Sequence, residues 1–289
     1  MTERAAAGRT ARSPADIGER GWRAVLARTW HAVTGLDVPM LAAGIAFYGV
    51  WAFFPALVAL VVVAGWLFGR GESIHLVALV RAELSPALST IVSDQLARVA
   101  QQPQGYAVAT VGGALLLAVW AGMRGVRGLC AALNRIYQEK ETRSFWHRQA
   151  LAFVLSTLCG AFLLATALMV AGLPALRASA NVDDPSSIIS IVKWIVVVGL
   201  LMLLLSILYR YAPSRRKPRW RWVTWGAAFS AASWVVVSVA FSYYAAQYGR
   251  LNPLLGSLGA IAIFMLWSYV GVLTVLAGAQ LNAEIERQA

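Results

Sequence analysis

A run of basic and aromatic residues at 208–222, LYRYAPSRRKPRWRW, is the stretch whose residue types most suggest chemistry. Six of its fifteen residues are Arg or Lys, and Tyr and Trp lie among them. In a soluble protein such a run is typical of a single-stranded nucleic-acid site, because rings stack on bases while cations follow the phosphates. The same composition is typical of a short cytoplasmic loop between two membrane helices. The rest of the chain decides between the two interpretations.

Groups that could form a catalytic or metal site are dispersed along the chain. His31, His75 and His147 show no metal-ligand spacing with one another or with a cysteine. A nuclease needs carboxylates or histidines that converge on a metal or a phosphate, whereas the carboxylates here are scattered. No Walker motif is present, so no nucleotide is expected as a partner. We therefore expect that the protein is not an enzyme and that it holds no metal and no cofactor.

The composition indicates a membrane protein. The 289 residues are 59% hydrophobic and only 13% charged, with a mean hydropathy of +0.64. A soluble domain usually carries about 25% charged residues, and half that level cannot cover the surface of a soluble protein of this size. Two cysteines, Cys130 and Cys159, are too few for a disulfide framework. We interpret both as small packing residues.

Six stretches are long and apolar enough to cross a bilayer, since a spanning helix needs about 20 apolar residues. They cover about 41–68, 105–123, 149–172, 188–208, 223–246 and 256–282. Lys193 is the only charge inside them, and it lies near the start of the fourth span, where its stem can reach the surface. The first span is longer than the apolar region of a signal peptide, so we expect that it is not cleaved.

Lys and Arg outside the spans gather on one side of the membrane. One side carries 19 of them and the other carries 5. This is the positive-inside pattern, and it predicts that both termini lie in the cytoplasm. The net charge of +12 therefore requires no nucleic-acid partner.

The run at 208–222 falls on the positive side, where its charge is expected without any nucleic acid. We interpret it as an inner-leaflet anchor, because a charge at the bilayer centre costs roughly 2.5–3.5 kcal/mol. The anchor residues are Arg215, Arg216, Lys217, Arg219 and Arg221. Attraction to anionic lipid headgroups, at about 1 kcal/mol per basic residue, accompanies this role. Membrane lipids are the expected partners, and no specific nucleic acid is expected.

The chain is predicted to divide into a disordered tail, an interfacial helix, the membrane domain and a short tail. Their ranges are 1–13, 14–36, 37–283 and 284–289. In the second segment an apolar stripe opposes arginines, which favours a helix lying on the inner leaflet. The stripe consists of Trp22, Val25, Leu26, Thr29, Trp30 and Val33. A soluble coupling helix packed on the cytoplasmic loops is the alternative.

The long loop after the first span is predicted to form an outer helical hairpin. Its stretches 74–84 and 88–99 are both helix-periodic, and Ser85 with Pro86 separates them.

Polar residues in or near the spans are the candidate lipid-binding groups, because unpaired polar groups are unfavourable in a bilayer. Pro55 is expected to kink the first span by removing a helix hydrogen bond. Arg124 and Arg127 follow the second span at inner headgroup depth, where they could hold a phosphate. The candidate set is Tyr48, Pro55, Arg124, Arg127, Asn134, Asn252, Ser257, Gln280 and Asn282. Packing or capping is the alternative role of each residue; together they suggest a polar strip along helices one, two, five and six.

Four stretches together resemble the YihY/BrkB family of bacterial inner-membrane proteins. They are AFYGVWAFFPAL, RGVRGLCAALNRIYQEKETRSFWHR, LYRYAPSRRKPRW and YGRLNPLLGSLGAIAIFMLWSYVGVLTVLAGAQLNAE. The resemblance implies six helices with both ends in the cytoplasm. It also implies a role in envelope integrity or lipid export. The family has, in addition, carried an old ribonuclease label. This chain has Ala52 and Gln280 where the family often has Ser and Glu.

We therefore predict an all-α integral membrane protein of the bacterial inner (cytoplasmic) membrane, with six transmembrane helices. The functional hypothesis is the transport or flipping of a lipid or other amphiphile for the cell envelope. No carboxylate lies inside a span, so a buried proton relay is not expected. The main alternative is a non-transporting envelope scaffold, and RNA processing is a disfavoured third. A homo-oligomer or an envelope protein partner is left open.

Overall fold

The protein is all helical over the residues that its computed structural model describes, which are 18–35, 37–68, 104–167, 169, 187–215, 220–248 and 256–288. The helices there are α2 (Glu19–Thr34), α3 (Asp37–Phe68), α6 (Gln104–Ile136), α7 (Phe145–Ala167), α9 (Ser187–Tyr211), α10 (Trp220–Tyr248) and α11 (Gly256–Gln288). All of them except α2 are long and apolar enough to cross a membrane. The predicted fold class, an α-helical protein with six spans, is confirmed.

Several helices extend beyond their predicted apolar spans. α6 continues to Ile136, and α11 continues to Gln288. Residues 284–288, expected to be part of a tail, are therefore the last turns of α11, with Glu284 and Ile285 buried. An apolar run marks where the hydrocarbon ends, but a helix continues wherever its polar residues find partners. The predicted N-terminal tail and the predicted outer hairpin lie outside the described residues.

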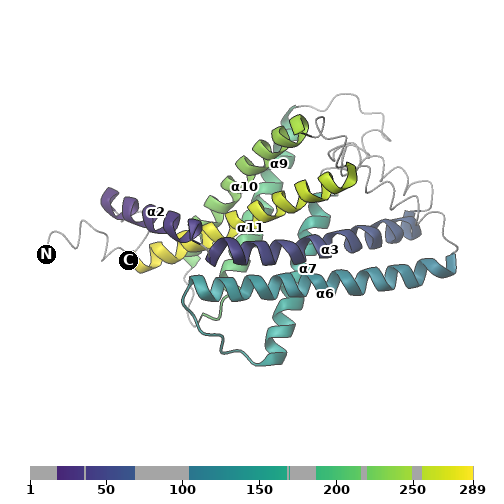
Figure 1. Cartoon of the computed structure of the whole chain (residues 1–289), viewed down its shortest axis with the longest axis horizontal. Helices are drawn as coiled ribbons and strands as arrows, with labels where there is room; N and C mark the ends of the chain where they lie inside the picture. Colours follow the sequence, from purple (N-terminus) through teal and green to yellow (C-terminus); the bar gives the residue numbers. More distant parts are fainter. Residues whose placement is uncertain are drawn as a thin grey trace.

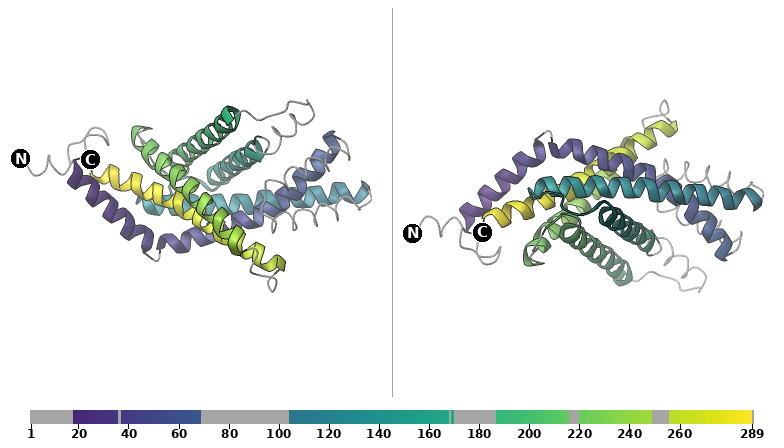
Figure 2. Two further views of the ribbon diagram at one scale, coloured as in Figure 1. Left: turned by 90° about the horizontal axis from the view of Figure 1, so that it is seen from above. Right: turned by 90° about the horizontal axis from the view of Figure 1, so that it is seen from below.

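The spanning helices share one end of the bundle, at which α3, α7 and α10 begin and α6, α9 and α11 end (Figure 1). We call it the charged end. α3 packs along α6 and α11, α10 packs along α9 and α11, and α7 contacts α6 and α9. α3 is helical through Pro55 and bends along its length (Figure 2), as a proline inside a helix predicts.

The hydrophobic core lies mainly toward the charged end. In α9 its members run from Leu201 to Tyr209, and in α6 they run from Val126 to Ile136. In Figure 1 the helices converge toward this end and spread toward the other. The charged end is therefore the best packed part of the described bundle.

α2 packs along the last turns of α11 (Figure 2). Val25 is fully buried there against Leu281 and Ile285. Leu26 and Trp30, from the other edge of the predicted apolar stripe, are 51% and 69% exposed. The stripe is thus divided between a protein contact and an exposed edge. The location of that edge at the membrane surface stays a prediction.

α10 crosses α11 at two glycines, Gly226 and Gly278, where an added Cβ on either would meet the other helix. Small residues allow such close approach between membrane helices. Tyr209 of α9 is fully buried and forms hydrogen bonds at this crossing. Its Oη lies 2.7 Å from Ser230 Oγ and donates to the Val275 carbonyl at 2.6 Å. Asn282 Oδ1 accepts the Gly226 N–H at 2.7 Å. These bonds join α9, α10 and α11.

Candidate functional site

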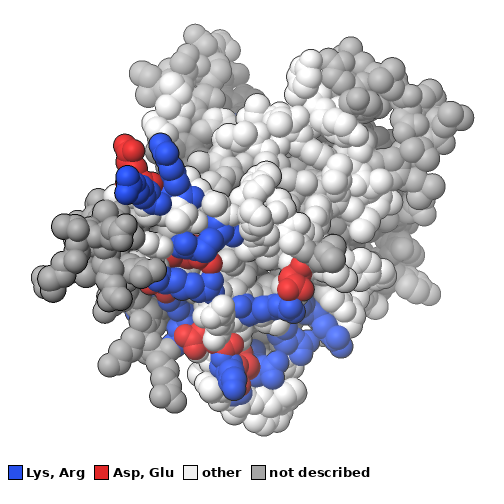
Figure 3. All heavy atoms as spheres, turned by 60° about the vertical axis from the view of Figure 1, so that its left-hand side comes forward, with Lys and Arg blue, Asp and Glu red and all other residues white. Residues whose placement is uncertain are grey.

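Most charged side chains of the described residues gather at the charged end (Figure 3), and most of the remaining visible surface is uncharged. They include two groups of neighbouring residues. The Glu284 cluster consists of Arg28, Gln280, Glu284, Arg287 and Gln288. The loop recess is a cavity lined by Arg127, Cys130, Ala131, Asn134, Arg135, Glu139, Glu141, Arg143, Arg148 and Leu151.

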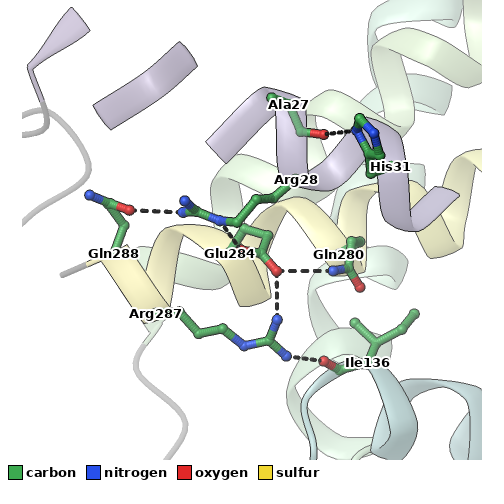
Figure 4. Close-up of polar contacts among 8 residues, drawn as sticks. All are labelled: Ala27, Arg28, His31, Ile136, Gln280, Glu284, Arg287 and Gln288. Atoms are coloured by element: carbon green, nitrogen blue, oxygen red, sulfur yellow. Dashed lines mark hydrogen bonds and ion pairs between the residues drawn. The ribbon is translucent and has the colours of Figure 1, made fainter. Parts of the chain in front are cut away.

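The Glu284 cluster joins three helices around one buried carboxylate (Figure 4). Glu284 on α11 is only 4% exposed. Its oxygens accept from Arg28 Nε of α2 at 2.6 Å, from Arg287 Nη1 at 2.5 Å and from Gln280 Nε2 at 3.1 Å. Arg287 Nη2 also donates to the Ile136 carbonyl at the end of α6, at 2.7 Å. A buried carboxylate needs such partners because desolvation otherwise disfavours its charge.

Arg215, one of the predicted anchor residues, binds other side chains of the protein. Its guanidinium forms an ion pair with Glu286 and lies 4.2 Å from the centre of the Tyr137 ring. Burial raises the pKa of Tyr137 above its ordinary value, and the charge of Arg215 offsets part of that rise. Tyr137 is therefore neutral at pH 7. Arg215 serves the protein fold here, as a partner of α11.

The loop recess begins where α6 ends. Gln138 takes a left-handed conformation (φ 57°), its N–H donates to the Arg135 carbonyl, and the Glu139 N–H donates to the Asn134 carbonyl. This pair of bonds is a Schellman motif, which satisfies the last carbonyls of a helix. It turns the chain from α6 into the loop that forms one wall of the recess.

The recess lies between α6, the 137–144 loop and the start of α7, and has a volume of about 320 Å³. Arg127, Cys130 and Asn134 line it from one face of α6, at one-turn spacing. Arg127 Nη1 donates to Gln149 Oε1 at 2.9 Å, which fixes the guanidinium against α7. Asn134 Nδ2 donates to Glu141 Oε2 at 3.0 Å. Four arginines face two glutamates in the lining, a net charge of +2.

Arg143 fixes the recess loop to α9. Its Nη1 donates to the Ala212 carbonyl at 2.9 Å, and its Nη2 donates to the carbonyls of Tyr211 at 3.0 Å and Pro213 at 2.6 Å. A cation at a helix C-terminus is favourable, because the last carbonyls are unpaired and carry the negative end of the helix dipole. The Ser214 N–H, which follows, donates to Asn134 Oδ1 at 2.7 Å.

An exposed strip on α3 and α6 leads toward the recess. The Arg124 guanidinium lies 5.2 Å from the centre of the Trp120 ring, and Trp120 is 48% exposed. The Tyr48 ring on α3 contacts Trp120 edge to face, with centroids 6.3 Å apart. Arg124 is exposed, whereas Arg127, three residues later, lines the recess. α6 thus presents one arginine on its exposed face and one in the cavity.

The predicted lipid-binding residues do not form a single site. Arg127 and Asn134 meet in the loop recess, whereas Tyr48 and Arg124 lie on the exposed strip. Gln280 and Asn282 are buried in packing contacts of α11, which is the alternative role foreseen for them. Predicted residues outside the described side chains are Asn252, Ser257, Arg216, Lys217, Arg219 and Arg221. The suggested polar strip along four helices is thus divided into separate groups.

Sequence reasoning missed Glu284, Arg143 and Arg148. Glu284 was treated as a residue of the chain end, although its spacing from Gln280 (i+4) and from Arg287 (i, i+3) is that of a helical polar cluster. Arg143 and Arg148 were only counted as charges of a cytoplasmic loop. Among the described residues, no group of three His, Cys, Asp or Glu side chains is placed to hold a metal ion.

Arg143→Gln is expected to loosen the recess loop and to lower the free energy of unfolding by about 1–2 kcal/mol, because its three carbonyl partners lose a cation. Hydrogen exchange should rise at residues 139–144 and 212–215, and the apparent Tm should fall. Lys140→Gln is the matched control, since Lys140 is exposed in the same loop and does not line the recess. Equal exchange in both variants would show that Arg143 does not hold the loop.

Comparisons with known proteins agree on a family of membrane proteins. A family model described as Virulence factor BrkB matches residues 29–289. The ribonuclease-like protein YfkH of Bacillus subtilis is 28% identical over 179 residues, which cover 60% of this chain and 65% of that protein. The UPF0761 membrane protein IL2447 of Idiomarina loihiensis is 28% identical over 156 residues, 54% of each chain.

A UPF0761 membrane protein of Tolumonas auensis is 34% identical over 79 residues, which cover 27% of this chain and 26% of that protein. The chain therefore spans less than two thirds of the length of each of these relatives. No solved structure matches the chain.

Proposed function

This chain belongs to the Virulence factor BrkB family and is a multi-pass protein of the bacterial inner membrane, and on that premise we propose that it transports or flips a lipid or other amphiphile with an anionic headgroup. Two arginines of α6 carry the proposal. Arg124 is exposed beside Trp120, and Arg127 lines the loop recess one turn later. A headgroup could pass from one to the other while its acyl chains stay in the bilayer.

By the positive-inside rule we take the charged end to face the cytoplasm, so that the exposed strip and the loop recess lie at the inner leaflet. Arginine suits this role because its planar fork binds phosphate oxygens in pairs. The proposed activity needs no enzymatic step, no cofactor, no nucleotide and no specific nucleic acid. Movement is then passive, or another component of the envelope supplies the energy.

The Arg124→Ala/Arg127→Ala variant is expected to flip fluorescent phospholipid in proteoliposomes at least about tenfold more slowly than the wild type. Each arginine can contribute a charge-assisted hydrogen bond, and about 1.4 kcal/mol corresponds to a factor of ten. The measurement is the rate at which dithionite-protected label becomes accessible. Arg23→Ala is the control, because Arg23 is an exposed arginine of α2, outside the strip and the recess.

A non-transporting envelope scaffold, which binds partner proteins or a second copy of itself, is the alternative. This alternative predicts that label becomes accessible to dithionite no faster in vesicles with wild-type protein than in vesicles without protein. It also predicts that neither Arg124→Ala/Arg127→Ala nor Arg23→Ala changes that rate. Equal flipping by the wild type and the double variant would show that the two arginines do not carry the substrate.

A further inference from the structure

We propose that the loop recess is a binding site for a dianionic phosphate monoester, carried either by a lipid headgroup or by a soluble metabolite. The proposal deepens the proposed function by naming the chemical group that the recess takes, and it rests on that function only where the source is a lipid.

The charge of the lining selects the class of ligand. The lining holds four arginines against two glutamates, a net charge of +2. Asp37, the partner of Arg135, lies outside the lining, and water screens this exposed pair, so Arg135 still counts toward that charge. A phosphate monoester carries about −1.5 to −2 at pH 7 and so matches this charge, whereas a phosphodiester with a single negative charge leaves about half of it uncompensated. The two carboxylates also disfavour more highly charged ligands such as nucleoside triphosphates, because each further negative charge is repelled by them.

Two of the arginines are held in place by uncharged groups, and neither forms an ion pair with a carboxylate among the described residues. Arg127 is bonded to the Gln149 amide and to the Met123 carbonyl. Arg143 is bonded to three backbone carbonyls at the end of α9. A guanidinium that is fixed before the ligand arrives loses less side-chain entropy on binding. These two groups form a preorganised wall for a phosphate.

Arg148 differs from them, since its guanidinium has no hydrogen-bond partner among the described residues. It lies on the first turn of α7, is exposed, and lines the same recess. Arg135, the fourth arginine, is already paired with Asp37 at 2.7 Å. Arg148 is therefore the arginine that can turn toward a ligand without breaking a contact of the folded protein.

The surroundings favour a ligand that stays attached to the membrane. Phe145 and Trp146 begin α7 beside the recess and are 63% and 79% exposed. Tryptophan side chains gather at headgroup level in membrane proteins. The volume of about 320 Å³ falls at the lower end of ligand-pocket sizes, which run from about 300 to 1,000 Å³. That room suits a phosphate with a small substituent.

Native mass spectrometry of the full chain in detergent tests the assignment with phosphatidic acid, phosphatidylglycerol and phosphatidylethanolamine of identical acyl chains. Phosphatidic acid is expected to be retained as a single adduct, in preference to both diesters. Arg148→Gln should weaken that retention about tenfold, the loss expected for one charge-assisted contact. Lys140→Gln, which removes an exposed charge of the 137–144 loop outside the lining, should leave the retention of phosphatidic acid unchanged.

Glycerol 3-phosphate, added as competitor, distinguishes the two sources. Displacement of phosphatidic acid by glycerol 3-phosphate assigns the site to the phosphate group itself, including its soluble forms; no displacement assigns it to the lipid. Equal retention of phosphatidic acid and phosphatidylglycerol would overturn the proposal, and so would retention that is the same in Arg148→Gln and in the wild type with both equally stable.

Native mass spectrometry and the flipping assay in vesicles together distinguish the recess site from the proposed transport function. Selective retention of phosphatidic acid without flipping in vesicles would support the recess site and contradict transport. Flipping without any preference for the monoester would support transport and overturn the recess site.

Discussion

Gly278→Ala is expected to destabilise the protein, although alanine at an ordinary interior position of a helix is more favourable than glycine. A methyl group at residue 278 would collide with Ser230 Oγ, with the Gly226 carbonyl and with Tyr209 Oη. Ser230 and Tyr209 are fully buried and bonded to each other, and they also contact the Thr274 and Val275 carbonyls. They cannot move aside without losing those bonds. Overpacking of this kind costs about 1–3 kcal/mol, occasionally more.

Thermal unfolding of the detergent-purified protein measures the effect, with Gly199→Ala as the control. Gly199 lies inside α9, and no atom of a neighbour lies within 4 Å of an added Cβ. Gly199→Ala is therefore expected to leave the apparent Tm unchanged or to raise it, whereas Gly278→Ala lowers it. A pair of variants with equal Tm would show that α10 and α11 do not approach as closely as described.

Glu284→Ala is expected to loosen α2 against α11, because Arg28 loses its carboxylate and Arg287 loses an ion pair. Breaking a fully buried ion pair costs about 3–5 kcal/mol. Arg28 and Arg287 are 44% and 37% exposed and can regain water, so we expect a smaller loss of about 1–3 kcal/mol. Hydrogen exchange should rise most over residues 19–34. The packing of Val25 against Leu281 and Ile285 remains, so α2 loosens rather than unfolds completely.

Glu139→Ala serves as the control for that experiment, since Glu139 is an exposed carboxylate of the recess loop, away from α2. Its exchange over residues 19–34 should match the wild type. Glu284→Gln should fall between the two, because an amide keeps a hydrogen-bond acceptor but loses the charge. Unchanged exchange of α2 in Glu284→Ala would mean that apolar packing alone holds the helix in place.

The fold could be predicted largely from the sequence because membrane helices are specified locally. About 20 apolar residues are enough to specify a span. The Pro55 bend likewise follows from a residue that lacks an N–H. These features depend on neighbours in the chain, so composition and periodicity are sufficient to find them.

The contacts of the charged end could not be predicted in the same way, because they join residues far apart in the chain. Arg28 and Glu284 are 256 positions apart, and neither position shows a pattern that names the other. The contacts of small residues likewise could not be predicted from the sequence. Gly44 and Gly49 of α3 are as small as Gly226 and Gly278, yet an added Cβ on either would meet no atom within 4 Å, whereas Gly226 and Gly278 form the tight crossing. Which face of a helix meets a neighbour depends on the tertiary arrangement.

The candidate site was only partly visible in the sequence for the same reason. Arg127 and Asn134 were identified because they follow a span on one helix. Arg143 and Arg148 come from the next loop and helix, and only the fold brings them to the same recess. The basic residues of the loop at 208–222 were assigned to the lipid surface, but Arg215 is bound to Glu286.

The rate of lipid movement between leaflets tests the proposed function most directly. Purified wild-type protein would be reconstituted into vesicles that carry a fluorescent phospholipid, beside vesicles without protein. We expect the protein-containing vesicles to expose inner-leaflet label to dithionite faster than the empty ones, in proportion to the amount of protein. Equal rates in the two preparations, with the protein shown to be folded and inserted, would contradict transport and favour the scaffold.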